Sequence, residues 1–386
     1  MFFFCKKLMF SFLIVGLLTA VSPTAQAIET IAREAIIVDM ETGKVLFAKD
    51  ADKKMPPASM SKLMTVYLLF ERLRDGSLSL EDTFRVSVDA WKRGGAKSGS
   101  STMFLEPEKR VKIADLIPGI IVQSGNDACI VVAEGISGSE EAFAEEMNRK
   151  ALELGMTNST FRNATGWPHP EHLMTARDLA TLAKRTIEDF PQYYAYYNEV
   201  SFTYNGIKQN NRNPLLYKDM GSDGLKTGHT QEAGYGLTAS ALRGGRRLVI
   251  VTNGLPTKKA RSREPERLLE WAFREFNNYA LFTKGEQVET ADVWLGVTPT
   301  VPLYIDQDVK ITLPRKARKD MKVSVAYTGP IPAPIAMGDQ IATLKIAAPG
   351  QETIEIPLLA AANVERLGLV GRLGAALTSI LWGHAG

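Results

Sequence analysis

The sequence predicts an α+β fold: an α/β sandwich domain with an antiparallel sheet and a helical cluster, then a small all-β domain and a C-terminal amphipathic helix. Three observations predict it. β-prone runs lie at both ends of a helical middle, and from about residue 285 short β-branched runs alternate with Pro and Gly. Residues 364–386 then space apolar side chains three and four apart. A chain of 386 residues has room for two domains of roughly 100–200 residues each.

The first domain is expected to span residues 28–284. Its strands form two hairpins with glycine turns, 35–39 with 45–48 and 234–242 with 247–252. Because these strands come from both ends of the domain, we expect one antiparallel sheet assembled from the two ends. Apolar residues three and four apart predict helices between them, at 60–76, 113–123, 140–154 and 175–187, and a closing helix at 265–276.

The second domain is expected over residues 285–362. Its β-branched runs are short and are broken by Pro and Gly, which is typical of a β-sandwich. The expected strands are 301–305, 309–313, 323–327, 341–346 and 353–358.

The final segment, residues 363–386, is expected to be an amphipathic helix. One helical face collects Leu367, Val370, Leu373, Leu377, Ile380 and Leu381. Its charged residues do not suit a transmembrane span, whereas the broad apolar face and Trp382 suit a helix lying in the lipid interface. Five glycines weaken the isolated helix, so lipid would have to stabilise it. A helix packed on the protein's own core is the alternative.

Residues 1–27 have the pattern of a secretory signal peptide. Lys6 and Lys7 precede an apolar run from Leu8 to Ala20, and Ala25-Gln26-Ala27 supplies small residues for cleavage. The run is shorter than the roughly 18–20 apolar residues of a membrane span, which disfavours an uncleaved anchor. We therefore expect cleavage after Ala27 and a protein that works outside the cytoplasm.

The composition excludes several classes of function. The 46 Lys and Arg against 43 Asp and Glu leave a formal charge of +3, which is too small for a strongly basic nucleic-acid-binding surface. Two cysteines exclude a disulfide scaffold, and four histidines do not favour a metal-centred enzyme. Cys5 would leave with the signal peptide, and Cys129 is expected to be a small buried hydrophobe. His169 and His172, beside Pro168 and Pro170, are expected in a surface loop rather than in a metal site.

A Ser-x-x-Lys pattern at Ser59 and Lys62 supplies two of the groups that acyl transfer needs. Residues three apart share a helix face, so the Lys62 amine can reach the Ser59 hydroxyl. The positive potential of a helix N-terminus favours an alkoxide and opposes a lysine charge, which tunes the lysine towards a neutral base. Alone the pattern is weak, since it is expected about once by chance, and a capped, solvated helix start is the alternative.

Two further motifs follow in order and strengthen this interpretation. Ser124-Gly125-Asn126 comes at the end of an apolar helix, where a tight turn can project a hydroxyl and an amide into one cleft. Lys226-Thr227-Gly228 precedes the expected strand at 234; its cation and hydroxyl suit a carboxylate, and its glycine lets a substrate backbone approach. Each pattern occurs once, in the order known for penicillin-binding proteins and class A β-lactamases.

With these motifs the chain resembles the D-alanyl-D-alanine carboxypeptidases, a family of low-molecular-mass penicillin-binding proteins. The resemblance extends through Pro57–Thr65, Gln123–Cys129, Thr175–Asp178, Asn211–Asn213 and Asp223–Thr230. It covers essentially the whole mature chain, including the β-rich domain and the C-terminal anchor. It implies removal of the terminal D-alanine from peptidoglycan stem pentapeptides, inhibition by β-lactams, no metal or organic cofactor, and a periplasmic protein held peripherally on the outer face of the inner membrane through lipid contacts of the last helix.

The resemblance also assigns roles to individual residues. Ser59 is the acyl-enzyme nucleophile, Lys62 its general base, and Ser124 relays a proton to the leaving D-alanine. Substrate is bound by Asn126, Lys226, Thr227, Gly228, His229 and Arg261. The backbone amides of Ser59 and His229 form the oxyanion hole, so the His229 imidazole is expected to be a bystander. Arg261 is either a carboxylate ligand or part of a solvated basic face with Lys258 and Lys259.

Three other functions are weighed against this one. A class A β-lactamase carries a Glu-x-x-Leu-Asn element whose glutamate activates water, and Glu171-His172-Leu173-Met174-Thr175 lacks that pattern. A D,D-endopeptidase would use the same catalytic groups, but such relatives usually lack the β domain and the anchor. A catalytically idle cell-wall binding module is disfavoured because all three motifs are complete.

Overall fold

The computed structural model describes residues 28–374, so the expected signal peptide (1–27) and the last residues of the expected anchor (375–386) lie outside the described residues. The strands are β1 (Glu34–Asp39), β2 (Val45–Lys49), β3 (Thr83–Arg85), β4 (Arg110–Lys112), β5 (Ser201–Tyr204), β6 (Ile207–Asn210), β7 (Ser222–Thr230), β8 (Gly234–Arg243), β9 (Arg246–Leu255), β10 (Phe276–Phe282), β11 (Gln287–Trp294), β12 (Thr300–Tyr304), β13 (Val309–Pro314), β14 (Lys322–Ala326), β15 (Ile331–Pro332), β16 (Gln340–Ala347) and β17 (Ile354–Ala360). The α-helices are α1 (Lys62–Arg74), α2 (Val88–Gly94), α3 (Ile113–Ile121), α4 (Asn126–Ser137), α5 (Glu140–Glu153), α6 (Ala176–Asp189) and α7 (Lys258–Glu275).

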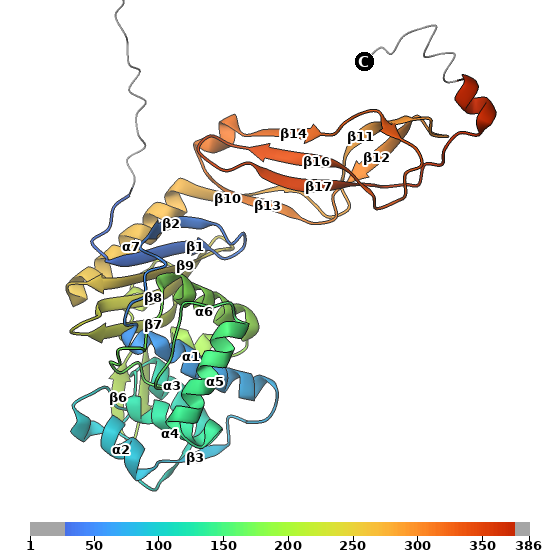
Figure 1. Ribbon diagram of the computed structural model, residues 1–386. Coiled ribbons are helices and arrows are strands. Elements are labelled where there is room, and N and C mark those ends of the chain that lie inside the picture. Colours follow the sequence, from blue (N-terminus) through green and yellow to red (C-terminus); the bar gives the residue numbers. More distant parts are fainter. Residues whose placement is uncertain (1–27, 375–386) are drawn as a thin grey trace, which may run out of the picture. The chain divides into compact units, whose positions relative to one another are not determined.

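The central sheet of the first domain confirms the expectation of one antiparallel sheet built from both ends of the domain. Within the described residues its strand order is β2-β1-β9-β8-β7 (Figure 1). The first hairpin joins the second because β1 pairs with β9, with Ile36 opposite Val251. β8 pairs with β9 on one side and with β7 on the other.

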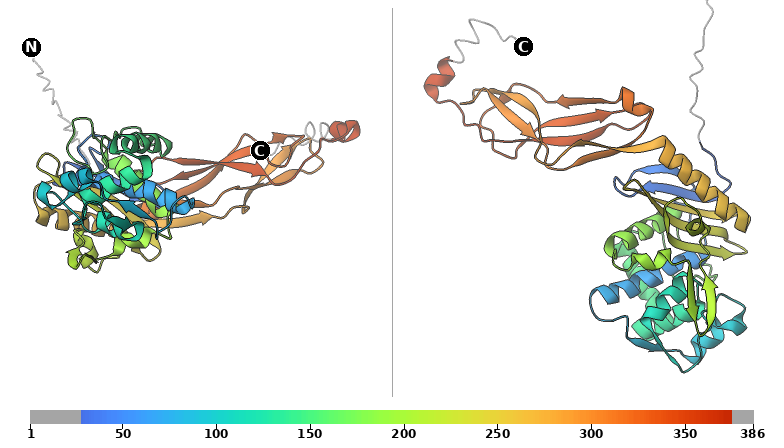
Figure 2. Two further views of the ribbon diagram at one scale, coloured as in Figure 1. Left: turned by 90° about the horizontal axis from the view of Figure 1, so that it is seen from below. Right: turned by 180° about the vertical axis from the view of Figure 1, so that it is seen from behind.

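The sheet is covered by helices on both faces, which explains why β1 is a continuous apolar run. α7 packs on one face and α6 on the other (Figures 1 and 2). Neighbouring side chains of β1 follow this division: Ile36 belongs to the large core that holds α1, α3, α4 and α6, whereas Ala35 packs with Leu255 and Ala260.

Two elements of this domain begin elsewhere than the sequence predicts. The helix expected from residue 60 starts at Lys62, because a 3₁₀ turn, η1 (Ala58–Ser61), precedes α1. The closing helix starts at Lys258 rather than at Pro265: the Thr257 side chain caps it by accepting from the Ala260 N–H, and Pro265 lies inside the helix. Because proline is favoured in the first turn of a helix, Pro265 is a misleading marker of where this helix starts.

The β-rich part of the chain has a core of its own. The strands β14-β16-β17-β12-β11-β15 form one sheet of the described residues, and β10 pairs with β13 in a second. Figure 1 labels most of these strands. Leu303, Leu344 and Leu358 lie fully buried between them. The all-β expectation is therefore confirmed. β10 also pairs with β13, although it precedes residue 285, where the short β-branched runs of the sequence begin.

The described part of the final segment runs on from this β-rich core. Val364 is buried and pairs with Ile335, and the Leu367 N–H donates to the Leu295 carbonyl. Residues 369–374 are helical, and their apolar side chains Leu369, Val370 and Leu373 are 74%, 86% and 67% exposed. Across residues 28–374, none of the helices combines the length and the apolar character needed to cross a bilayer.

Candidate active site

Ser59 and Lys62 meet at the junction of η1 and α1. Lys62 Nζ lies 3.0 Å from Ser59 Oγ and also donates to the Thr165 carbonyl. The Lys62 side chain is fully buried although it ends in an amine. The solvated helix start that was the alternative is therefore not what the structure shows.

The two lysines of the motifs both have pKa values below the ordinary range. Burial lowers the pKa of Lys62 from 10.5 to about 8, and burial likewise holds the pKa of Lys226 well below 10.5, with repulsion from Lys62 as the next cause. Desolvation disfavours an ammonium more than an amine. Lys62 is therefore available as a neutral base near physiological pH.

The Ser-x-Asn motif lies in the turn between α3 and α4. Ser124 has a positive φ of 65°, and Asn126 begins α4. Both side chains are buried, and neither Ser124 Oγ nor Asn126 Oδ1 has a hydrogen-bond partner within residues 28–374. Buried polar atoms without protein partners are costly unless another molecule satisfies them, so this pair suits a polar substrate.

The first turn of α4 faces Lys62 and supports a neighbouring loop. Asp127 and Cys129 interact electrostatically with Lys62, which places this turn beside the Ser59–Lys62 pair. Cys129 is buried as expected, and burial raises the pKa of its thiol to about 12. The buried Asp127 carboxylate accepts from Thr102 Oγ1 (2.7 Å) and from the N–H groups of Met103 (2.8 Å) and Leu105 (3.1 Å). We call this set of hydrogen bonds the Asp127 clamp, and no local sequence pattern predicts it.

The Lys-Thr-Gly motif precedes the strand that begins at Gly234, as expected, and it lies in a strand of its own, β7, which the sequence did not predict. Lys226 and Thr227 are buried. At Gly228 an added Cβ would lie 2.8 Å from the Pro57 carbonyl oxygen and 3.3 Å from Ala58 Cβ, so only glycine lets β7 pack against the turn that carries Ser59. All three motifs are thus brought to one place, at the junction of the sheet and the helical cluster.

His229 and Arg261 extend the site along β7. The His229 ring is exposed and stacks on Tyr235, with centroids 3.9 Å apart. Arg261 is buried rather than solvated: its Nη1 donates to the Gly228 carbonyl at 3.4 Å, and its Nε has no partner among the described residues. Burial lowers the pKa of Arg261. This placement favours the carboxylate-ligand alternative over the solvated face.

Arg212, which lies in the family-like stretch Asn211–Asn213, is a further cation near the site. Its Nη1 donates to Ser101 Oγ at 2.6 Å, and its charge repels those of Lys62, Lys226 and Arg261. Four basic groups therefore converge on a site that would hold an anionic substrate.

The histidine loop corrects one expectation. His169 is exposed as predicted, but His172 is buried: its Nδ1 accepts from the Arg162 N–H at 3.2 Å, its ring packs on Phe161, and burial lowers its pKa to about 4. The flanking prolines predict a surface loop, but they do not indicate that the His172 side chain points into the protein. Within the described residues, no group of three or more His, Cys, Asp or Glu side chains is arranged to hold a metal ion.

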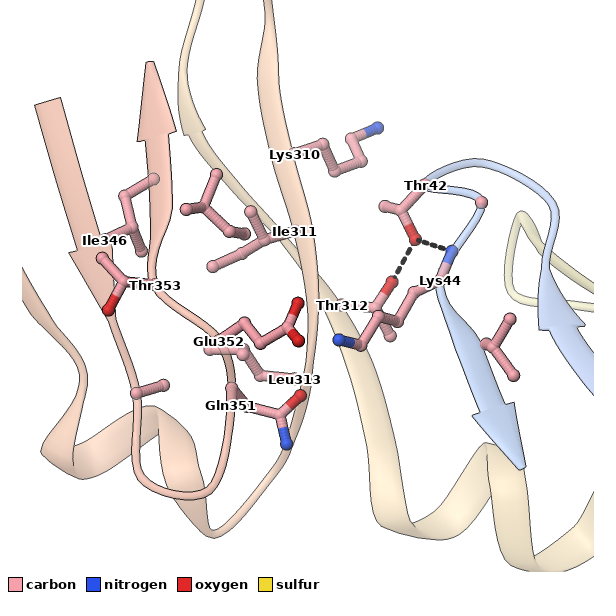
Figure 3. A pocket seen from close by; sticks show the side chains of 14 residues that line it. Thr42, Lys44, Lys310, Ile311, Thr312, Leu313, Ile346, Gln351, Glu352 and Thr353 are labelled. Atoms are coloured by element: carbon pink, nitrogen blue, oxygen red, sulfur yellow. Dashed lines mark hydrogen bonds between the residues drawn. The ribbon is translucent and has the colours of Figure 1, made fainter. Parts of the chain in front are cut away.

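A cavity of about 480 Å³ lies away from the motifs, between the β1–β2 turn and β13 (Figure 3). Thr42, Lys44 and Lys310 line it, together with Gln351 and Glu352 from the β16–β17 loop. Thr42 Oγ1 hydrogen-bonds Thr312 Oγ1 across its edge. None of the predicted site residues lines this cavity.

The fold and the three motifs define a serine acyl-transfer protein of the penicillin-interacting type. Residues 19–257 match the family described as D-alanyl-D-alanine carboxypeptidase, and residues 276–366 match the penicillin-binding protein 5 C-terminal domain. The chain belongs to the D-alanyl-D-alanine carboxypeptidase family. It is 40% identical over 367 residues to the D-alanyl-D-alanine carboxypeptidase DacC of Escherichia coli, covering 94% of this chain and 92% of that protein.

Solved structures agree with this assignment. The penicillin-binding protein 5 of Haemophilus influenzae matches with a TM-score of 0.78 and 34% identity, covering 89% of this chain and all of that one. The D-alanyl-D-alanine carboxypeptidase DacD of Francisella tularensis matches with a TM-score of 0.79 and 29% identity, covering 88% and 95% of the two chains. The likeness therefore includes both domains.

Proposed function

We propose that the protein is a serine-type D-Ala-D-Ala carboxypeptidase that removes the terminal D-alanine from peptidoglycan stem pentapeptides through an acyl-enzyme on Ser59. The observation that carries the proposal is the buried Lys62 amine, 3.0 Å from Ser59 Oγ and with a pKa of about 8. A general base is most effective when its pKa lies near the working pH. This activity serves cell-wall biosynthesis and remodelling.

In the acylation step, Lys62 takes the proton of Ser59 as Oγ attacks the carbonyl carbon of the penultimate D-alanine. The backbone N–H groups of Ser59 and His229 stabilise the oxyanion. When the C–N bond breaks, Ser124 relays the proton from Lys62 to the leaving amine, so D-alanine departs and Lys62 is neutral again. In deacylation Lys62 removes a proton from water as the water oxygen attacks the ester carbonyl. The same proton then passes from Lys62 to the leaving Ser59 oxygen, which restores the hydroxyl and the neutral amine.

In this proposal the basic side chains of the site hold the terminal carboxylate of the substrate. Lys226, Thr227 and Arg261 bind it, while Asn126 hydrogen-bonds the substrate backbone and Gly228 lets that backbone approach β7. Among residues 28–374, Arg261 Nε and Asn126 Oδ1 have no hydrogen-bond partner, which supports these roles because each would gain one on binding.

The same nucleophile accounts for β-lactam recognition. A penicillin places its strained amide carbonyl where the scissile peptide carbonyl lies, so Ser59 Oγ opens the ring and carries a penicilloyl ester. The missing Glu-x-x-Leu-Asn glutamate predicts slow release of this adduct. The penicillin-binding protein D2 of Listeria monocytogenes, 30% identical over 64% of this chain with a TM-score of 0.55, was solved with ampicillin bound.

A carboxypeptidase is favoured over an endopeptidase by the extent of the likeness. The D-alanyl-D-alanine endopeptidase of Escherichia coli is 29% identical and covers 66% of this chain, whereas the carboxypeptidase DacC covers 94%.

We further propose that the protein is secreted after loss of residues 1–27 and works in the periplasm, held on the outer face of the inner membrane by the amphipathic segment 363–386. The exposure of Leu369, Val370 and Leu373 supports a lipid contact, because a helix packed on the protein's own core would bury them. In this proposal residues 28–284 form the catalytic domain and residues 285–362 the β-sandwich domain.

Labelled penicillin tests the proposed nucleophile. The wild type should gain one covalent label, and Ser59→Ala should gain none. Ser61→Ala is the matched control: its hydroxyl lies in the same turn and donates to the Ala58 carbonyl at 3.2 Å, so this variant should still be labelled. A labelled Ser59→Ala protein would contradict the assignment, and an unlabelled wild type would favour the idle binding module.

A further inference from the structure

We propose that Asn163 is a positioning residue that holds the Thr165 carbonyl against the Lys62 amine and thereby aims the base at Ser59. The inference rests on the proposed role of Lys62 as general base. It adds a residue that lies outside the three motifs and acts through the main chain of its neighbour.

Asn163 organises the three residues that follow Ala164. Its Oδ1 accepts from the N–H groups of Thr165 (3.2 Å), Gly166 (2.8 Å) and Trp167 (3.1 Å) and from Thr165 Oγ1 (3.0 Å). Its Nδ2 donates to the Trp167 carbonyl at 3.1 Å. One half-buried side chain therefore satisfies most of the polar groups of this turn and fixes its conformation.

The carbonyl that this turn presents is a partner of the catalytic amine. Lys62 Nζ donates to the Thr165 oxygen and lies 3.0 Å from Ser59 Oγ. A neutral amine has two N–H bonds and one lone pair, so a carbonyl that accepts one N–H limits the directions in which the lone pair can point. The base is productive only when that lone pair faces the Ser59 hydroxyl.

The turn also packs directly on the nucleophile's own turn. Gly166 has a φ of 77°, and an added Cβ there would lie 2.1 Å from the Ala58 carbonyl oxygen and 2.6 Å from Ser61 Oγ. A small rotation of the 165–166 peptide would therefore disturb both catalytic groups.

The preceding residue is held by other side chains. The Ala164 N–H donates to Glu140 Oε1 (3.0 Å), and Thr65 Oγ1 donates to the Ala164 carbonyl (2.7 Å). Loss of the Asn163 amide would therefore leave the loop in place and release only the segment that begins at Thr165.

The chain offers a matched control in Asn148. Its Nδ2 donates to the Phe161 carbonyl (2.9 Å) and to the Ala144 carbonyl (2.9 Å), and its Oδ1 accepts from the Phe161 N–H (2.8 Å). Asn148 thus anchors the same loop at its start, and its hydrogen bonds within the described residues go to Ala144 and Phe161 rather than to the turn at Thr165. A merely structural effect of loosening this loop should appear in Asn148→Ala.

The experiment measures penicillin acylation of the full-length protein, with the noncovalent dissociation constant separated from the acylation rate constant. We use Asn163→Ala, Asn163→Asp and Asn148→Ala at about pH 9, where a group with a pKa of about 8 is mostly neutral. In Asn163→Ala the rate constant should fall at least about tenfold while the dissociation constant changes less than about twofold, because the base is misdirected and the binding groups are intact.

Asn163→Asp keeps the oxygen that accepts the turn's N–H groups, and it should recover the rate constant to within about threefold of the wild type. Asn148→Ala should keep both constants within about twofold while unfolding at a lower temperature. An unchanged rate constant in Asn163→Ala, an equal loss in Asn148→Ala, or no recovery in Asn163→Asp would overturn the inference while the wild type is still labelled. An unlabelled wild type would instead overturn the proposed function.

Discussion

Lys62 Nζ lies 3.0 Å from Ser59 Oγ, and the lysine side chain is fully buried with no carboxylate hydrogen-bonded to it anywhere in residues 28–374. Burial disfavours the charged form of this amine more than nearby charges favour it, so its pKa falls to about 8. Burying the Lys62 amine lowers the stability of the folded protein, and it also gives the site a base whose pKa is close to physiological pH.

The pKa of Lys62 predicts the pH dependence of acylation. The base is active when it is neutral, and burial lowers its pKa to about 8. The acylation rate constant should therefore rise with pH and level off above about pH 8, with one proton controlling the change. Stopped-flow measurements with a labelled penicillin from about pH 6 to 9.5 test this. A rate constant that does not change across this range would contradict Lys62 as the base.

The same shift predicts a change in stability with pH. The pKa of Lys62 is lowered from 10.5 in the unfolded chain to about 8 in the folded one, so the unfolded chain binds more protons between these values. Stability therefore rises with pH in that interval, by about 2 kcal/mol between pH 7 and 9.5 for this one group.

In Lys62→Met this contribution is absent. The stability of the wild type relative to the variant should increase from about pH 7 to 9.5, as measured by urea unfolding at each pH. If the difference in the free energy of unfolding between the two proteins did not change with pH, the pKa of Lys62 would be the same in the folded and unfolded chains, which would contradict the lowered value.

The Asp127 clamp predicts a large stability effect. Asp127→Ala would leave the Thr102 hydroxyl and the Met103 and Leu105 N–H groups without their acceptor in a buried place. We expect a loss of at least about 3 kcal/mol in the free energy of unfolding. Asp89→Ala is the contrasting control: its ion pair with Arg93 is exposed, and its loss should cost less than about 1 kcal/mol. Equal losses in urea unfolding would contradict the clamp.

Membrane attachment can be tested without damaging the β-rich core. Because Val364 is buried and Leu367 hydrogen-bonds Leu295, a truncation should follow Gly368 rather than Asn363. The shortened protein should leave the membrane fraction and stay folded and active. A full-length Leu369→Ser, Val370→Ser, Leu373→Ser variant should be partly released, and about 1 M salt should release the wild type only modestly. Unchanged partition of both variants would exclude this segment as the anchor.

Benzylpenicillin distinguishes this protein from a class A β-lactamase. The penicilloyl adduct should persist on Ser59, so mass spectrometry should find the modified protein long after mixing, and steady-state hydrolysis should be slow. Turnover on the order of hundreds per second, within the range of efficient hydrolases, would contradict the assignment.

Much of the fold and the site follows from local sequence patterns. The two hairpins were predictable because apolar β-prone runs flank glycine turns, and the three motifs were recognisable because each combines a rare spacing with the right chemistry. The starts of α1 and α7 were less predictable. A 3₁₀ turn before Lys62 has no periodicity of its own, and Pro265 favours a helix start even where it lies within a helix.

The supporting residues could not be predicted because their roles depend on distant partners. Asp127 is next to a motif, but its partners lie 22–25 residues earlier. Thr165 contributes its main-chain oxygen, which every residue type has, so the sequence does not single this residue out. It also lies 103 residues from Lys62. The burial of Arg261 likewise depends on how α7 packs, whereas its sequence neighbours Lys258 and Lys259 suggest a solvated face.

The central claim is release of D-alanine by Ser59, and mass spectrometry of a pentapeptide that ends in D-Ala-D-Ala tests it most directly. The wild type should convert the pentapeptide to the tetrapeptide with one D-alanine released per cleavage, and prior treatment with penicillin should abolish this conversion. Ser59→Ala should leave the pentapeptide intact, and Ser61→Ala should still cleave it. Undiminished release after penicillin treatment, or release by Ser59→Ala, would contradict the account.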